Sequence, residues 1–98
     1  MAMAAKGLAK LIEECGELQQ IAGKKLAYFH CNNHPDDKGP LKERLEDECA
    51  DVMAAILFVI EAMELDLTKI EERTKNKYDK FSLWHRIQNN NLHGIDRR

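Results

Sequence analysis

The sequence predicts an all-α protein, a long helix-loop-helix followed by a third helix. Apolar residues recur at steps of three and four in residues 8–29 and again in residues 41–63, which is the spacing of a buried helix face. Between them, residues 30–39 are dense in Asn, Asp, Gly and Pro, a composition typical of a loop. A segment of good helix formers, residues 66–81, follows.

The first predicted helix has two carboxylates at the edges of its apolar face. That face is formed by Leu8, Leu11, Ile12, Cys15, Leu18, Ala22, Leu26 and Phe29. Glu14 and Glu17 flank it, whereas Glu13 points further toward the polar surface. A carboxylate taken from water without a partner costs several kcal/mol, so this pair needs compensation.

The loop contains a short Cys/His cluster, His30, Cys31 and His34. Zinc normally has four such ligands, and no second Cys or His pair completes the set, so the cluster does not favour a zinc site. The role of this loop stays open.

The second predicted helix carries the more informative acidic pair. Its apolar face is formed by Leu41, Leu45, Val52, Ala55, Val59 and Met63. Glu48 falls inside this stripe and Asp51 lies at its margin, about one turn along the same side. Four converging carboxylates repel one another and either raise their own pKa values or bind cations. Oxygen ligands favour a hard cation, Mg²⁺ or Mn²⁺, and Mg²⁺ sites commonly include substrate phosphates.

These two acidic motifs resemble those of the all-α nucleotide pyrophosphohydrolases of MazG type. The family pattern, Glu-Glu-x-x-Glu followed by Glu-x-x-Asp on the next helix, is matched by Glu13-Glu14-Cys15-Gly16-Glu17 and Glu48-Cys49-Ala50-Asp51. The resemblance covers roughly residues 6–81. It implies that Glu14, Glu17, Glu48 and Asp51 are metal ligands and that Glu13 orients water, all five forming the catalytic set.

The resemblance also implies a reaction and a phosphate grip. Family members hydrolyse nucleoside triphosphates to the monophosphate and pyrophosphate, with two or three Mg²⁺ (or Mn²⁺) ions polarising the phosphate and activating water. In the third helix, which begins with Asp66 as its predicted N-cap, the family supplies cationic or amide side chains to the phosphates. The corresponding candidates are Arg73, Asn76 and Lys77, and Lys10 of the first predicted helix is a further one.

The nearly all-round apolar stretch 52–60 implies partner helices, because three helices of this length cannot cover both of its faces. A homodimer is the minimal solution. The resemblance implies an intersubunit four-helix bundle, as a homodimer or a homotetramer.

Composition limits the other possibilities. The chain of 98 residues predicts one domain, residues 1–85, and a polar C-terminal tail, residues 86–98. Its net charge of −2 gives no general attraction to nucleic acid polymers. The longest apolar run has nine residues, short of the roughly 20 that span a membrane, and the three cysteines favour a reducing compartment, so we expect a cytoplasmic protein.

The sequence therefore predicts a metal-dependent nucleoside triphosphate pyrophosphohydrolase that controls or cleans a nucleotide pool. Two alternatives remain: a phosphoribosyl-ATP pyrophosphohydrolase, which has similar acidic motifs, and a non-catalytic acidic helical interaction module. The base and sugar preferences are not indicated, and Trp84 could either stack on a base or anchor the chain.

Overall fold

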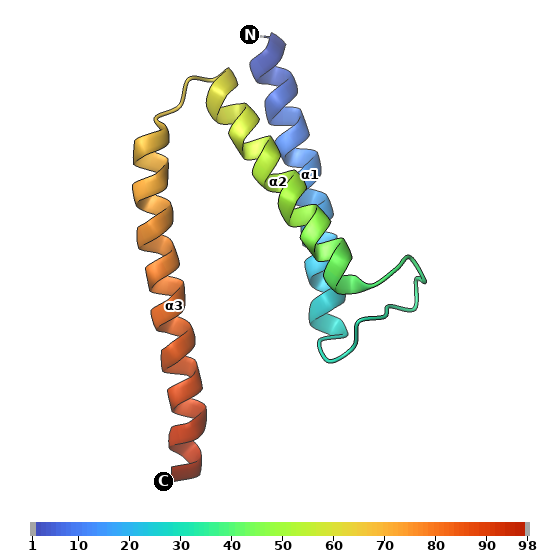
Figure 1. Cartoon of the computed structure of the whole chain (residues 1–98), viewed down its shortest axis with the longest axis vertical. Coiled ribbons are helices and arrows are strands. Elements are labelled where there is room, and N and C mark those ends of the chain that lie inside the picture. The colour runs from blue at the N-terminus through green and yellow to red at the C-terminus, as the bar shows by residue number, and fades with distance from the viewer. Residues whose placement is uncertain (1, 98) are drawn as a thin grey trace. The chain divides into compact units, whose positions relative to one another are not determined.

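The computed structural model describes the backbone of residues 2–97 and the side chains of residues 2–89. Over these residues it contains three helices, α1 (Ala2–Ala27), α2 (Leu41–Ala62) and α3 (Leu67–Arg97), and no strand (Figure 1). The prediction of an all-α fold is confirmed. The chain divides into two compact units, Met1–Leu65 and Asp66–Arg98.

The first unit is an antiparallel pair of helices, α1 and α2, joined by the loop 28–40 (Figure 1). Its small core lies between the two helices and consists of Ile21, Leu41, Val52, Ala55 and Val59. The helices approach closely at Gly7, where an added Cβ atom would lie only 2.9 Å from Cδ1 of Phe58. This close approach places side chains on facing turns of α1 and α2 within reach of one another.

Leu41 is the largest fully buried side chain described, with an exposed fraction of 0%. We expect Leu41→Ala to lower the free energy of unfolding by about 2–5 kcal/mol, because it removes apolar burial and leaves a cavity. Urea denaturation followed by circular dichroism measures this change. The control is Lys42→Ala, which truncates the exposed neighbour of Leu41 in the first turn of α2 and should change the stability by less than about 1 kcal/mol. Equal losses from the two variants would contradict this description of the core.

The loop 28–40 is tied to both helices by hydrogen bonds. Pro40 is the N-cap of α2 and offers no side-chain hydrogen bond, so Asn32 satisfies the first N–H groups of the helix. The backbone carbonyl of Asn32 accepts from the Leu41 N–H at 2.7 Å, and its side-chain Oδ1 accepts from the Lys42 N–H at 2.8 Å. On the other side, Nζ of Lys25 donates to the backbone carbonyls of Phe29 and Cys31, each at 3.0 Å. The loop is thereby held against the helix ends that it joins.

Much of the apolar surface of the first unit is exposed. On α2, Met53 is 65% exposed, Leu57 is 59% exposed and Ile56 is 40% exposed. On α1, Leu8, Ile12 and Leu26 are also exposed. Single exposed apolar residues are ordinary, but this many on one short helix pair is typical of a surface that packs against a partner.

In the second unit, α3 begins as the sequence predicts. Oδ1 of Asp66 accepts a hydrogen bond from the Lys69 N–H at 3.1 Å, which confirms Asp66 as the N-cap. The helix extends past residue 85, where the sequence predicts a polar tail to begin, and no proline interrupts it. Trp84 is exposed in this unit. The side chains of residues 90–98 lie outside those described, and the predicted division at residue 85 stays a prediction.

None of the three helices, over the residues described, combines the length and the apolar character that crossing a membrane requires.

Candidate metal centre

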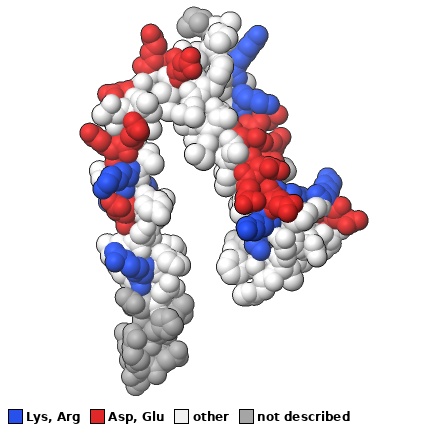
Figure 2. Space-filling view, in the orientation of Figure 1, with Lys and Arg blue, Asp and Glu red and all other residues white. Residues whose placement is uncertain are grey.

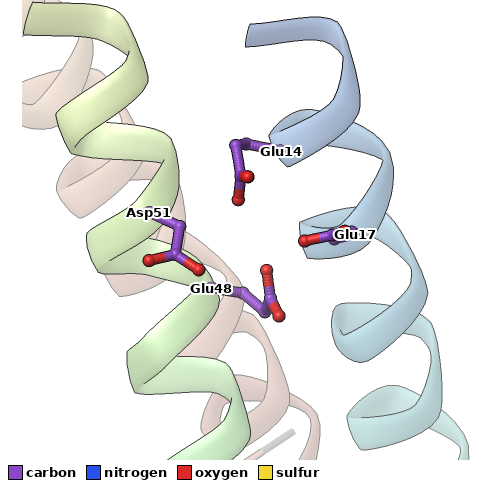
Figure 3. A group of neighbouring side chains, drawn as sticks. All are labelled: Glu14, Glu17, Glu48 and Asp51. Carbon is purple, nitrogen blue, oxygen red and sulfur yellow. The ribbon is translucent and has the colours of Figure 1, made fainter. Parts of the chain in front are cut away.

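Four carboxylates from facing turns of α1 and α2 converge between the two helices of the first unit. Glu14 and Glu17 lie on α1, and Glu48 and Asp51 lie on α2 (Figure 3). One oxygen from each side chain lies within 4.8 Å of the corresponding oxygens of the other three. The structure thus brings together all four residues that the sequence predicts as metal ligands. Their metal-binding role stays a prediction.

Two of these carboxylates each have a buried oxygen atom without a hydrogen-bond partner among the described residues. Glu14 is only 7% exposed, and its Oε2 atom has no hydrogen-bond partner among the described residues. The Oε2 atom of Glu48 is also buried and unpartnered. Burial, followed by the negative charges of Glu17 and Asp51, raises the pKa of Glu48 above its usual range. Buried carboxylates are normally paired or bind a metal, so this cluster has the donors and the unmet electrostatic need of a divalent cation site.

The donor set indicates which cations fit. All four side chains offer oxygen only, which suits Mg²⁺ and Mn²⁺. Zn²⁺ and Cu²⁺ sites normally include Cys or His ligands, and no described Cys or His belongs to this group.

Lys10 lies at one edge of the cluster and partly neutralises it. Its Nζ atom is 3.3 Å from Oε1 of Glu14 and 3.5 Å from Oε1 of Glu13. The hydrogen bond to Glu14 is the main reason that the pKa of Lys10 is raised above its usual value. Glu13 is largely exposed and lies outside the four converging carboxylates, and its water-orienting role stays a prediction.

Two hollows flank the four carboxylates, and each hollow is lined by a different two of them. One hollow of about 300 Å³ is lined by Glu17, Gln20, Ile21, Lys24, Arg44, Asp47 and Glu48. The other, of about 280 Å³, is lined by Lys10, Glu14, Asp51, Ala54, Ala55 and Phe58. In the space-filling view, acidic side chains gather along the helix pair with basic side chains next to them (Figure 2).

Asp36 in the loop holds the two cations of the first hollow. Nζ of Lys24 donates to Oδ2 of Asp36 at 2.7 Å, and the Arg44 guanidinium donates to both carboxylate oxygens at 3.0 Å. Arg44, and to a smaller extent Lys24, holds the pKa of Asp36 well below its usual range. The helical periodicity of the sequence did not indicate this ion cluster, because its three members are separated by eight and twelve positions across a loop.

We expect Asp36→Asn to lower the melting temperature at pH 7, because it removes the carboxylate that binds Lys24 and Arg44. Folding lowers the pKa of Asp36 from a usual value of 3.8, so the charged form stabilises the folded state above about pH 4. This contribution is lost as the pH falls toward the folded-state pKa. The difference in melting temperature between the wild-type protein and Asp36→Asn should therefore narrow below about pH 4.

Thermal melts between about pH 2.5 and pH 7 measure this difference. Asp37→Asn is the matched control, since Asp37 is exposed and asparagine tolerates its positive φ of 57°. A role for the Asp36 charge would be contradicted if Asp36→Asn lowered the melting temperature equally at all pH values. It would also be contradicted if Asp37→Asn lowered the melting temperature as much.

The remaining predicted phosphate ligands lie in the second unit. Arg73, Asn76 and Lys77 are exposed on α3 and share one side of that helix, where they line a hollow of about 300 Å³ together with Lys69, Glu72 and Lys80. Their role toward the four carboxylates stays a prediction.

Comparison with protein-family models, with curated proteins and with solved structures finds no match to this chain. Membership of the MazG-type family therefore stays a prediction from the sequence.

Proposed function

We propose that this protein is a homo-oligomeric, Mg²⁺- or Mn²⁺-dependent nucleoside triphosphate pyrophosphohydrolase. The observation that carries the proposal is the convergence of Glu14, Glu17, Glu48 and Asp51, with buried oxygens of Glu14 and Glu48 left without a partner. The carboxylates of an ordinary acidic surface stay in water, because burying them is costly. A metal site offsets that cost, because the bound cation compensates the buried charges. The motif resemblance supports the same activity.

In this proposal the four carboxylates hold the divalent cations, and Glu13 orients water at the edge of the site. Bound cations supply charge neutralisation of the triphosphate and acidify water for attack. Water attacks the α-phosphorus, and the bond from this phosphorus to the oxygen that bridges to the β-phosphorus breaks. The products are the monophosphate and pyrophosphate. Without a cation, the clustered carboxylates repel the substrate, so activity should depend fully on added metal.

The exposed apolar residues of α1 and α2 support the oligomeric part of the proposal. A second copy of the chain that packs against Met53, Ile56 and Leu57 would bury side chains that one helix pair leaves in water. The minimal assembly is a homodimer with an intersubunit four-helix bundle, and a homotetramer doubles it.

The test is product analysis with a panel of the common NTPs and dNTPs, first with Mg²⁺ and then with Mn²⁺. Anion-exchange chromatography separates monophosphate, diphosphate, pyrophosphate and phosphate. Monophosphate with an equal amount of pyrophosphate is expected, and the panel identifies the preferred base. Release of diphosphate and phosphate would contradict the proposal.

If none of the NTPs and dNTPs in the panel is hydrolysed, phosphoribosyl-ATP is assayed next. Hydrolysis of that substrate alone would select the alternative enzyme. No turnover there either, with metal bound and the oligomer intact, would favour the acidic interaction module.

A further inference from the structure

The two hollows beside the metal centre differ in chemistry. The four carboxylates divide between them, because Glu17 and Glu48 line one hollow and Glu14 and Asp51 line the other. An elongated ligand centred on the carboxylates would therefore place one end in each hollow. Which end occupies which hollow depends on the remaining lining residues.

The hollow at the loop end is lined by Lys24 and Arg44 together with Asp47 and the two shared carboxylates, and its cations keep N–H donors that Asp36 does not use. Arg44 uses two of its five N–H donors on Asp36, and Lys24 uses one of its three. Asp36 also fixes the two side chains in place, so little rotamer freedom remains to be lost when they bind an anion. Arg44 and Lys24 are about 20% and 32% exposed, which keeps them accessible and partly shielded from solvent.

The hollow at the opposite end is mainly apolar. Apart from the two shared carboxylates, it is lined by Ala54, Ala55, Phe58 and Lys10, and the Lys10 ammonium already pairs with Glu14 and Glu13. The Phe58 ring is 41% exposed, so one part of it packs near Gly7 while the rest remains open to a ligand. Exposed aromatic rings stack well on nucleobases.

We propose that the nucleotide lies along the helix pair in one orientation, an inference that rests on the proposed function. Its β- and γ-phosphates extend into the hollow of Lys24 and Arg44, and its nucleoside extends into the hollow of Phe58 and Ala54. The most negative part of the substrate thus meets the free N–H donors, and its least polar part meets the apolar side chains. Lys24 and Arg44 become binding residues for the leaving pyrophosphate.

Isothermal titration calorimetry of the full-length, Mn²⁺-loaded protein tests this orientation with two probes, inorganic pyrophosphate and the four deoxynucleoside monophosphates. We expect Lys24→Gln to weaken pyrophosphate binding about tenfold and to change monophosphate binding less than about twofold. Ala54→Leu fills the apolar hollow, so it should weaken monophosphate binding about tenfold and leave pyrophosphate binding within about twofold.

Two matched controls accompany these variants. Lys25→Gln removes the neighbouring lysine, which binds loop carbonyls instead of Asp36, and Ala50→Leu adds the same bulk at an exposed α2 position that lines neither hollow. Neither should change the binding of either probe. Circular dichroism melts confirm that each variant is folded, and Lys24→Met replaces Lys24→Gln if that variant is not.

An inverted pattern, or equal effects of the two variants on both probes, would overturn the orientation and leave the proposed function standing. Unchanged binding of both probes in both variants would also overturn it. A wild-type protein that binds Mn²⁺ but neither probe would overturn the proposed function itself, and the orientation with it.

Discussion

Glu48→Gln is expected to reduce pyrophosphohydrolase activity to less than about a tenth of the wild-type value and, in the absence of metal, to raise the melting temperature. The activity falls because the neutral amide is a poor ligand for a hard cation. The metal-free protein becomes more stable because the substitution removes one of four mutually repelling charges, and the raised pKa of Glu48 reflects that repulsion together with burial.

The same variant should lose the stabilisation that metal binding provides. A ligand at about 100 times its Kd stabilises the folded state by about 2.7 kcal/mol, which corresponds to a rise of roughly 10–20 °C in the melting temperature of a domain of this size. Differential scanning fluorimetry with and without Mg²⁺ or Mn²⁺ measures this rise, which should be present in the wild-type protein and absent in Glu48→Gln.

Glu46→Gln is the matched control for Glu48→Gln. Glu46 is exposed on α2, two positions before Glu48, and does not belong to the cluster. Its substitution should preserve both activity and the metal-induced rise. Retention of more than about a tenth of the activity by Glu48→Gln would contradict its assignment as a metal ligand. Unfolding of Glu48→Gln would show that Glu48 has a structural partner instead.

Ile56→Glu is expected to dissociate the homo-oligomer and weaken self-association about a hundredfold or more, because it places an unpaired charge within an apolar interface. Ile56 lies near Met53 and Leu57 in the exposed apolar part of α2 and does not line either hollow beside the metal centre. The melting temperature should fall as well, since the core of one helix pair is small. Sedimentation velocity at micromolar concentration measures the change.

The control adds the same charge at a polar position, with Gln88→Glu on the exposed surface of α3. Its sedimentation should match that of the wild-type protein. A wild-type protein that sediments as a monomer, or an Ile56→Glu variant that retains the wild-type oligomer, would contradict the assignment of this apolar surface as a subunit interface.

The existence of three helices and the membership of the acidic cluster could be predicted from the sequence, although α3 extends well past the predicted residues 66–81. Both follow from local rules: apolar side chains at helical spacing define a face, Asp66 caps the helix that follows it, and residues one turn apart, such as Glu48 and Asp51, project to the same side. These rules act within a few residues along the chain. They also place both acidic pairs at the edges of apolar faces, so packing of those faces brings the pairs together.

The surroundings of the cluster could not be predicted from the sequence, because they depend on how distant segments pack together. Asp36 lies in the loop and binds Lys24 and Arg44, which belong to different helices, and no helical periodicity encodes contacts across such a loop. The division of the four carboxylates between a hollow that contains Lys24 and Arg44 and a mainly apolar hollow likewise depends on the antiparallel packing of α1 against α2. Contacts between distant positions depend on the path of the chain and on packing. The proposed orientation of the substrate rests on such contacts.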